Sequence, residues 1–198
     1  VMVHEVCHGW IALRNGDDTA LIHGRLSFNP VRHIDPFGTL IMPALCVLAH
    51  FPPIGWAKPV PVDAHKLRSP RMALVRVAMV GPFSNLVLSV SAAVAFKLVA
   101  GLPAFFPQHQ EILLNALLFG VQINLMLAFF NLIPIHPLDG SGVLSGLLPR
   151  RARLIYDRHK PYGFVIILLM VNMGITRAIM VAPSAFIWSL LGKMGLIW

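Results

Sequence analysis

EILLNALLFGVQINLMLAFFNLI, at residues 111–133, shows what class of protein this chain belongs to. The stretch is long enough to cross a bilayer, since a spanning helix needs about 20 predominantly apolar residues. Residues 71–101 form a still longer apolar run before it, and residues 162–182 form another after it. These runs predict an α-helical polytopic membrane protein, built as a bundle of transmembrane helices.

The composition supports the same class. Hydrophobic residues make up 57% of the 198 residues and charged residues only 12%, whereas soluble domains carry about 25% charged residues. A chain of this length predicts one membrane-embedded domain over residues 1–198. The formal charge of +8 is spread through loops without a DNA- or RNA-binding motif, so we expect no nucleic-acid partner. Two cysteines give no disulfide framework.

The basic residues also predict an orientation. Lysines and arginines crowd residues 58–76 and 150–160, whereas residues 102–110 contain none. Positive loops lie on the cytoplasmic side of membranes. We therefore expect a multi-pass protein of the cell membrane, with both basic segments in the cytoplasm and with Asp139 toward the cytoplasmic end of its helix.

The sequence patterns of the shorter segments between residues 19 and 63 predict their local structure. Residues 19–33 contain β-like stretches and a turn at Asn29-Pro30. Residues 36–56 are apolar but interrupted by prolines. They either span the membrane or form a re-entrant segment that enters it and returns to the same side. Residues 57–63 alternate and carry prolines that cannot donate to a ladder, which predicts an edge strand or hairpin arm. Together these segments predict a short membrane-associated β-hairpin region, and helices are expected at residues 1–14, 141–149 and 183–198.

His4-Glu5-Val6-Cys7-His8 is an H-E-x-x-H motif. Residues four apart share a helix face, so His4 and His8 can place two imidazoles on one metal ion. Glu5 lies beside that face and can act as general base toward a water molecule.

A catalytic zinc site usually has three protein ligands, and Asp139 is the candidate for the third. It follows a spanning apolar run, in Pro137-Leu138-Asp139-Gly140, where a carboxylate is costly unless it has a function. The alternative is that Asp139 simply caps the helix expected at 141–149. Beside the H-E-x-x-H motif we favour the ligand, and one carboxylate can serve both purposes.

These motifs together resemble the site-2 protease family of intramembrane zinc metalloproteases. The resemblance rests on His4-Glu5-x-x-His8 followed by Asn131-x-x-Pro134-x-x-Pro137-Leu138-Asp139-Gly140. Three intervening stretches resemble the compact bacterial and archaeal branch, which lacks PDZ and CBS domains: His33-Ile34-Asp35-Pro36-x-Gly38-Thr39, Gly55-Trp56-Ala57-Lys58-Pro59-Val60-Pro61-Val62 and Gly81-Pro82-x-x-Asn85.

The resemblance implies one zinc ion per chain, held by His4, His8 and Asp139. Glu5 would be the catalytic base in hydrolysis of a peptide bond within or near a transmembrane segment of a membrane-anchored protein, which is regulated intramembrane proteolysis. The helical substrate must unwind locally, and we expect the strand at 57–62 to pair with it. Family members carry a transmembrane helix before the motif helix, so we expect this chain to lack that helix.

Five further polar residues are candidates for supporting roles near the site. Asn131 lies in the family motif, where it would orient the substrate or the loop of Asp139. Asn85 is a substrate-site candidate too, although we favour a hydrogen bond between helices, a common role of polar residues in membranes. His136 is read as loop packing or as support for a ligand. His33 and Asp35 either lie near the site or fix a local turn.

Two other functions compete with the protease. The first is a catalytically impaired or truncated relative that acts as a membrane binding or scaffold protein. The second is a metal transporter that uses the same ligands in transit. A transporter should line a path with several intramembrane acids or histidines, whereas here the candidates converge on one site.

Overall fold

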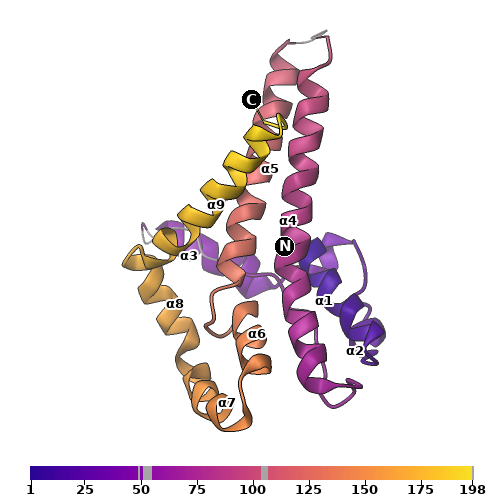
Figure 1. The fold of residues 1–198 in the computed structure, drawn as a ribbon, viewed down its shortest axis with the longest axis vertical. Helices are drawn as coiled ribbons and strands as arrows, with labels where there is room; N and C mark the ends of the chain where they lie inside the picture. Colours follow the sequence, from indigo (N-terminus) through magenta and orange to yellow (C-terminus); the bar gives the residue numbers. More distant parts are fainter. Residues whose placement is uncertain (49, 51–54, 104–106, 198) are drawn as a thin grey trace. The chain divides into compact units, whose positions relative to one another are not determined.

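The computed structural model describes residues 1–48, 50, 55–103 and 107–197 (Figure 1). The chain divides into two compact units, Val1–Val80 and Gly81–Trp198. The boundary lies inside α4 (Pro70–Ala100), so one continuous helix contributes to both units.

The first unit is built from short helices around α1 (Met2–Arg14). It also contains α2 (Thr19–Ile22), η1 (Pro30–His33), η2 (Pro36–Ile41), α3 (Met42–Leu48) and the first turns of α4. Gly9 lets α1 approach its neighbours closely, because a Cβ there would lie 2.7 Å from the Leu26 side chain and 3.0 Å from that of Val60.

The predicted β-hairpin region is wrong for the part of the chain that the structure describes, which contains no strand. Residues 19–33 form α2 and η1 instead, with Asn29 capping η1 through the Val31 N–H at 3.0 Å. Residues 57–63 are irregular because their N–H groups do not meet another strand. Lys58 N–H donates to His33 O, Val60 N–H to the Glu5 carboxylate and Asp63 N–H to the Asp17 carboxylate.

The topology expected for residues 36–56 is only partly described. Residues 36–48 form η2 and α3, an apolar helical stretch that is shorter than the roughly 20 residues a span needs. Residues 49 and 51–54 lie outside the described residues.

The second unit contains the rest of α4 and α5 (Pro107–Asn131), followed by α6 (Asp139–Leu147), α7 (Arg150–Tyr156), η3 (Asp157–Tyr162), α8 (Gly163–Asn172) and α9 (Ile175–Lys193). Its larger core joins α4, α5 and α9 through buried side chains such as Phe96, Leu125 and Leu191. A smaller core joins the segment after α5 to α8 through Ile133, Leu138 and Ile167.

Within the described residues, three helices are long and apolar enough to cross a membrane: α4, α5 and α9. The membrane class of the prediction is therefore confirmed, but the third span is displaced. The apolar run at 162–182 is broken at Gly174, whose φ of 71° is left-handed and favours glycine. The long helix starts after this break. Of the terminal helix predicted at 183–198, residues 183–193 form the second half of α9, which ends at Lys193, and residue 198 lies outside the described residues.

Candidate metal and catalytic site

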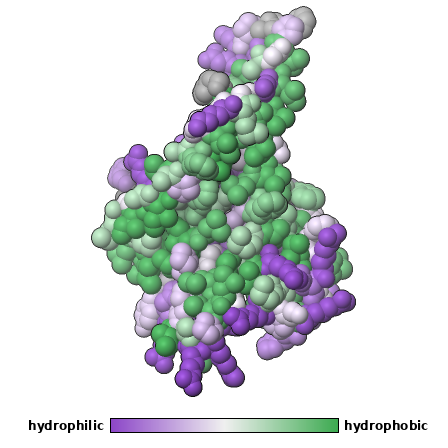
Figure 2. Space-filling model, viewed as in Figure 1, coloured by the Kyte–Doolittle hydropathy of each residue, from purple (hydrophilic) through white to green (hydrophobic). Residues whose placement is uncertain are grey.

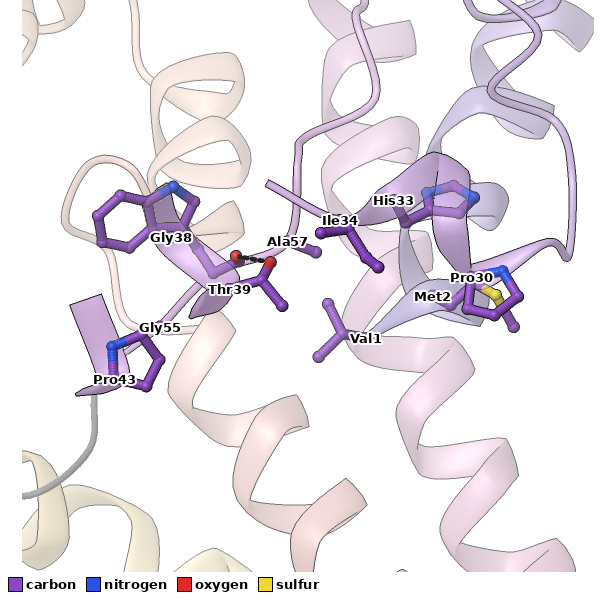
Figure 3. A pocket seen from close by; sticks show the side chains of 11 residues that line it. Val1, Met2, Pro30, His33, Ile34, Gly38, Thr39, Pro43, Gly55 and Ala57 are labelled. Carbon is purple, nitrogen blue, oxygen red and sulfur yellow. Dashed lines mark hydrogen bonds between the residues drawn. The ribbon is translucent and has the colours of Figure 1, made fainter. Parts of the chain in front are cut away.

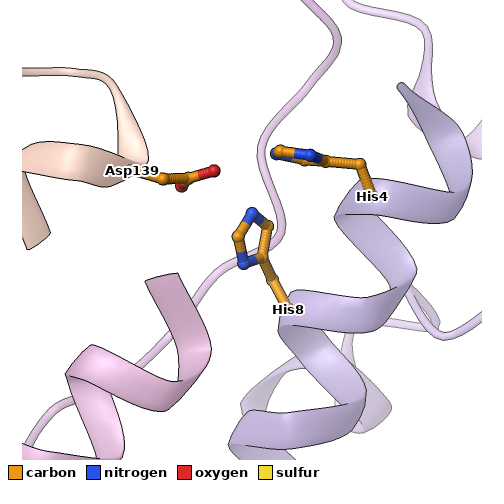
Figure 4. A group of neighbouring side chains, drawn as sticks. All are labelled: His4, His8 and Asp139. Carbon is orange, nitrogen blue, oxygen red and sulfur yellow. The ribbon is translucent and has the colours of Figure 1, made fainter. Parts of the chain in front are cut away.

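His4 and His8 lie one turn apart on α1, and both side chains are buried (Figure 4). Their ring centroids are 4.6 Å apart, and the rings meet edge to face. The i, i+4 spacing therefore brings the two imidazoles together, as the sequence predicts. Two neighbouring buried imidazoles are a donor set that suits zinc.

A backbone carbonyl orients the ring of His8. Its Nδ1 lies 2.6 Å from the carbonyl oxygen of Val77 on α4. Because a carbonyl can only accept, Nδ1 carries the proton in the neutral ring and Nε2 carries the lone pair. Histidines that bind metals typically donate their other N–H in this way, so His8 fits the role of a zinc ligand.

Glu5 lies between the two histidines in sequence and is half-buried. Its Oε2 accepts the Val60 N–H at 3.0 Å. Val60 is itself buried, so the irregular segment 57–63 packs against α1 beside the motif. The hydrogen bond fixes the position of one carboxylate oxygen of Glu5.

A pocket of about 360 Å³ opens beside the start of α1 (Figure 3). Its walls combine the first residues of α1 with η1, η2 and residues 55–57, and they are largely apolar. The backbone N–H of Trp56 donates to Gly38 O at 3.1 Å, and Thr39 Oγ1 donates to the backbone carbonyl of Trp56 at 2.9 Å. These bonds hold the wall of a pocket that suits an apolar side chain.

His33 and Asp35 make local hydrogen bonds in this wall. His33 Nε2 lies 2.7 Å from Ser27 O. Asp35 Oδ1 caps η2 by accepting the N–H groups of Phe37 and Gly38 at 2.9 Å and 2.8 Å. The local role that the sequence left open is thus present for both residues.

Asp139 belongs to the second unit and is the first residue of α6. Leu138 is the N-cap, so the alternative that Asp139 caps this helix is wrong. A carboxylate in the first turn suits the positive end of the helix dipole. The next residue is Gly140, where the backbone of the preceding loop comes very close. A Cβ at this position would meet the carbonyl oxygens of Leu132 and Ile133.

The loop before Asp139 is held by two residues that sequence reasoning missed. Tyr156 Oη donates to Pro134 O at 2.7 Å, and His159 Nε2 accepts the His136 N–H at 3.1 Å. His159 Nδ1 lies 2.5 Å from Tyr156 O, which fixes its tautomer. Neither Tyr156 nor His159 lies in an apolar run or in a motif, and the sequence therefore suggests a surface position for His159.

His136, Asn131 and Asn85 lie in the second unit. The ring centroid of His136 is 5.8 Å from that of His159. Burial, together with the charges of Lys160 and His159, lowers the pKa of His136 below its ordinary value. Asn131 Nδ2 donates to Leu127 O at 2.9 Å, within its own helix. Asn85 is buried on α4.

Comparison with known proteins gives one family. A model of peptidase family M50 matches residues 106–173. "Putative zinc metalloprotease YwhC" of Bacillus subtilis is 37% identical over 172 residues, which cover 85% of this chain and 74% of that protein. "Putative zinc metalloprotease Rip2" of Mycolicibacterium smegmatis is 28% identical over 180 residues, and the chain spans 64% of it. No solved structure matches the chain significantly.

Proposed function

Because the chain belongs to peptidase family M50, the site-2 protease family of zinc metalloproteases, we propose that it is an intramembrane zinc endopeptidase. It would hydrolyse a peptide bond within or near a transmembrane segment of a membrane-anchored protein. The observation that carries the proposal is the buried His4–His8 pair, with His8 oriented by the Val77 carbonyl, in a chain whose described residues include three apolar helices long enough to span.

We propose that one zinc ion is held by His4, His8 and Asp139. The tautomer of His8 and the edge-to-face packing of the two rings support the first two ligands. Asp139 is supported by its place at the start of α6, after an apolar span. Three protein ligands are the usual set of a catalytic zinc site. We also propose that residues 1–198 act as one metalloprotease domain, as expected for a membrane chain of this length.

The chain's own residues would carry the proton transfers. When bound, zinc would polarise the scissile carbonyl and lower the pKa of a water molecule toward about 7. Glu5 would accept a proton from the attacking water and pass it to the leaving amine nitrogen. The Val60 N–H would keep the Glu5 carboxylate in place during both transfers. The apolar pocket beside α1 would receive a substrate side chain.

We propose a multi-pass position in the cell membrane, with the site toward the cytoplasmic side. The basic segments 58–76 and 150–160 and the segment 102–110 without Lys or Arg support this orientation. The supported substrate class is therefore a membrane-anchored protein with a transmembrane segment that can unwind. Asn131 and Asn85 remain candidates for orienting that segment.

The test is cleavage of a model transmembrane substrate in nanodiscs, with zinc content measured on the same samples. We expect Glu5→Gln to lower the cleavage rate by about 10²–10⁴-fold, the usual contribution of a general base, with zinc content unchanged. The amide oxygen of Gln can still accept the Val60 N–H, so the fold should persist.

Glu111→Gln is the matched control, because it removes an exposed acid at the start of α5. It should cleave at the wild-type rate. Full cleavage by Glu5→Gln would assign the base to another residue. Zinc binding without cleavage in the wild type would favour the binding or scaffold role instead.

A further inference from the structure

The segment formed by α7 and η3 carries an excess of positive charge. Residues 150–162 contain five Lys or Arg residues and one acid, Asp157. Asp157 pairs with Arg153 at 3.5 Å and with Lys160 at 3.2 Å. The exposed Arg150, Arg151 and Arg158 form no ion pair with any described residue. We call these three arginines the basic face. Figure 2 shows hydrophilic side chains gathered where α7 lies.

Large apolar side chains are exposed among these arginines. Leu154 and Ile155 on α7 are 63% and 67% exposed, and Tyr162 at the end of η3 is 67% exposed. Arginines without acidic partners next to exposed Leu, Ile and Tyr are typical of a segment lying in the interface of a membrane. Anionic headgroups attract basic segments of this kind, and the described residues place no acid in an ion pair with these three arginines.

The same segment is hydrogen-bonded to the chain on both sides of Asp139. Before it, Tyr156 Oη donates to Pro134 O and His159 accepts the His136 N–H. After it, Ser145 Oγ on α6 donates to the Asp157 carboxylate at 3.2 Å. Whatever restrains α7 and η3 therefore also restrains the loop 132–138 and α6.

We propose that the basic face binds the headgroups of anionic phospholipids, and that this binding orders the loop 132–138 that leads into Asp139. The lipid site stands on the charge and exposure of α7 and η3. A consequence for catalysis rests in addition on the proposed function. Anionic lipid would then act as an activator, because it steadies the loop that leads into Asp139, a proposed metal ligand.

The first experiment measures amide hydrogen exchange of the full chain in phosphatidylcholine nanodiscs containing increasing fractions of phosphatidylglycerol. We expect protection of 150–162 and of 132–138 to rise together with phosphatidylglycerol, and to weaken with added salt because salt screens charge. Arg150→Gln/Arg151→Gln/Arg158→Gln should need at least about tenfold more phosphatidylglycerol, given the contribution of each basic residue near an anionic surface.

Two matched variants separate charge from other effects. Replacing the same three arginines with lysine keeps the charge and should keep the response. Lys97→Gln/Arg177→Gln/Lys193→Gln removes three exposed charges elsewhere in the second unit and should respond like the wild type. A wild-type response in the glutamine variant of the basic face overturns the lipid site. So does protection by inorganic phosphate in pure phosphatidylcholine, which would indicate a soluble anion.

The coupling has its own test. Tyr156→Phe removes the bond to Pro134 O but leaves the basic face intact. It should keep the lipid response of 150–162 and lose part of that of 132–138. Protection confined to 150–162 in the wild type contradicts the coupling. Since exchange needs neither zinc nor substrate, these results can be read even if the chain cleaves nothing. If the chain cleaves a substrate, its cleavage rate should rise with phosphatidylglycerol in the wild type and in the lysine variant, but not in the glutamine variant of the basic face.

Discussion

The environment of His8 distinguishes it from a histidine that merely fills space. Its buried ring is oriented by the Val77 carbonyl, so Nε2 carries the lone pair that a metal needs. The i, i+4 spacing to His4 can be read from the sequence. The contact with the Val77 carbonyl cannot be predicted from the sequence, because Val77 lies 69 residues away and every residue has a backbone carbonyl.

We expect His8→Ala to weaken zinc binding by more than about 100-fold, since loss of a supporting partner alone costs 10–100-fold. Zinc affinity would be measured by competition with a chelator. His23→Ala is the control: its Nδ1 also faces a carbonyl, that of Thr19 at 2.8 Å, but the ring is exposed. Equal affinities of the two variants would remove His8 from the ligand set.

At the scale of elements, residues 57–63 show why an alternating pattern can mislead. Val60 and Val62 between prolines give the period of two that predicts a strand. The N–H groups of Val60 and Asp63 are satisfied by carboxylates of Glu5 and Asp17, far away in sequence. No local signal shows that the partners are side chains. A Val60→Pro variant would therefore disturb Glu5 directly, whatever the substrate does.

The side chain of Asp17 lies between α1 and α2 and links them to residue 63 through hydrogen bonds. It accepts the Thr19 N–H at 3.0 Å and the Asp63 N–H at 2.7 Å, and its side chain is buried. Burial acts to raise the pKa of Asp17, but the hydrogen bonds from Thr19 and Asp63 and the charge of Lys66 outweigh it. The pKa is therefore lowered. A lowered pKa gives stability above the unfolded value of about 3.9, and this stability is lost as the pH falls through the folded value.

We therefore expect the Tm in a nonionic detergent to fall as the pH drops below about 4, and Asp17→Asn to reduce that fall. At neutral pH, Asp17→Asn should destabilise by about 1–3 kcal/mol, because buried donors lose a charged acceptor. Asp18→Asn is the control, since Asp18 forms an exposed pair with Lys66, and such pairs contribute little. An unchanged acid dependence in Asp17→Asn would contradict this account.

The position of the start of α6 depends on glycine at residue 140, because only a residue without a Cβ fits there. A Cβ there would meet backbone carbonyls of residues 132 and 133, which cannot rotate away. We expect Gly140→Ala to cost about 1–3 kcal/mol in thermal or chemical unfolding, as overpacking usually does, and to lower zinc affinity because the start of α6 must shift.

Gly120→Ala on α5 is the matched control. Its Cβ would meet only the Ala92 Cβ, at 3.6 Å, and alanine is favoured over glycine inside a helix. This variant should be as stable as the wild type or more so. Equal effects of the two substitutions would mean that helix propensity, and not close approach of the loop, determines the outcome at Gly140.

At the scale of the whole molecule, hydropathy located the membrane helices better than it located their ends. Residues 71–101 and 111–133 correspond closely to α4 and α5. The third span was misplaced because the run from 162 stays apolar across the break at Gly174, and hydropathy does not register a left-handed residue. His159 and Tyr156 were missed for a related reason: their partners are backbone groups of the loop 132–138.

The charge pattern makes a prediction for the whole chain in its membrane. Leu102 and Arg150 are both exposed, and they lie on opposite sides of α5 and α6 in sequence, in a neutral and a basic segment. The positive-inside rule predicts that Arg150 lies in the cytoplasm and Leu102 on the outer side. We would introduce Leu102→Cys or Arg150→Cys into a chain carrying Cys7→Ala and Cys46→Ala, and label it with a membrane-impermeant maleimide.

In right-side-out vesicles we expect rapid labelling at position 102, and labelling at position 150 only after permeabilisation. Inside-out vesicles should give the reverse, which controls for differences in thiol reactivity. Labelling of both positions from one side would mean that α5 does not span. The reversed pattern would place the basic face at the outer surface, because the electrostatic preference that orients loops would have been overridden by the rest of the chain.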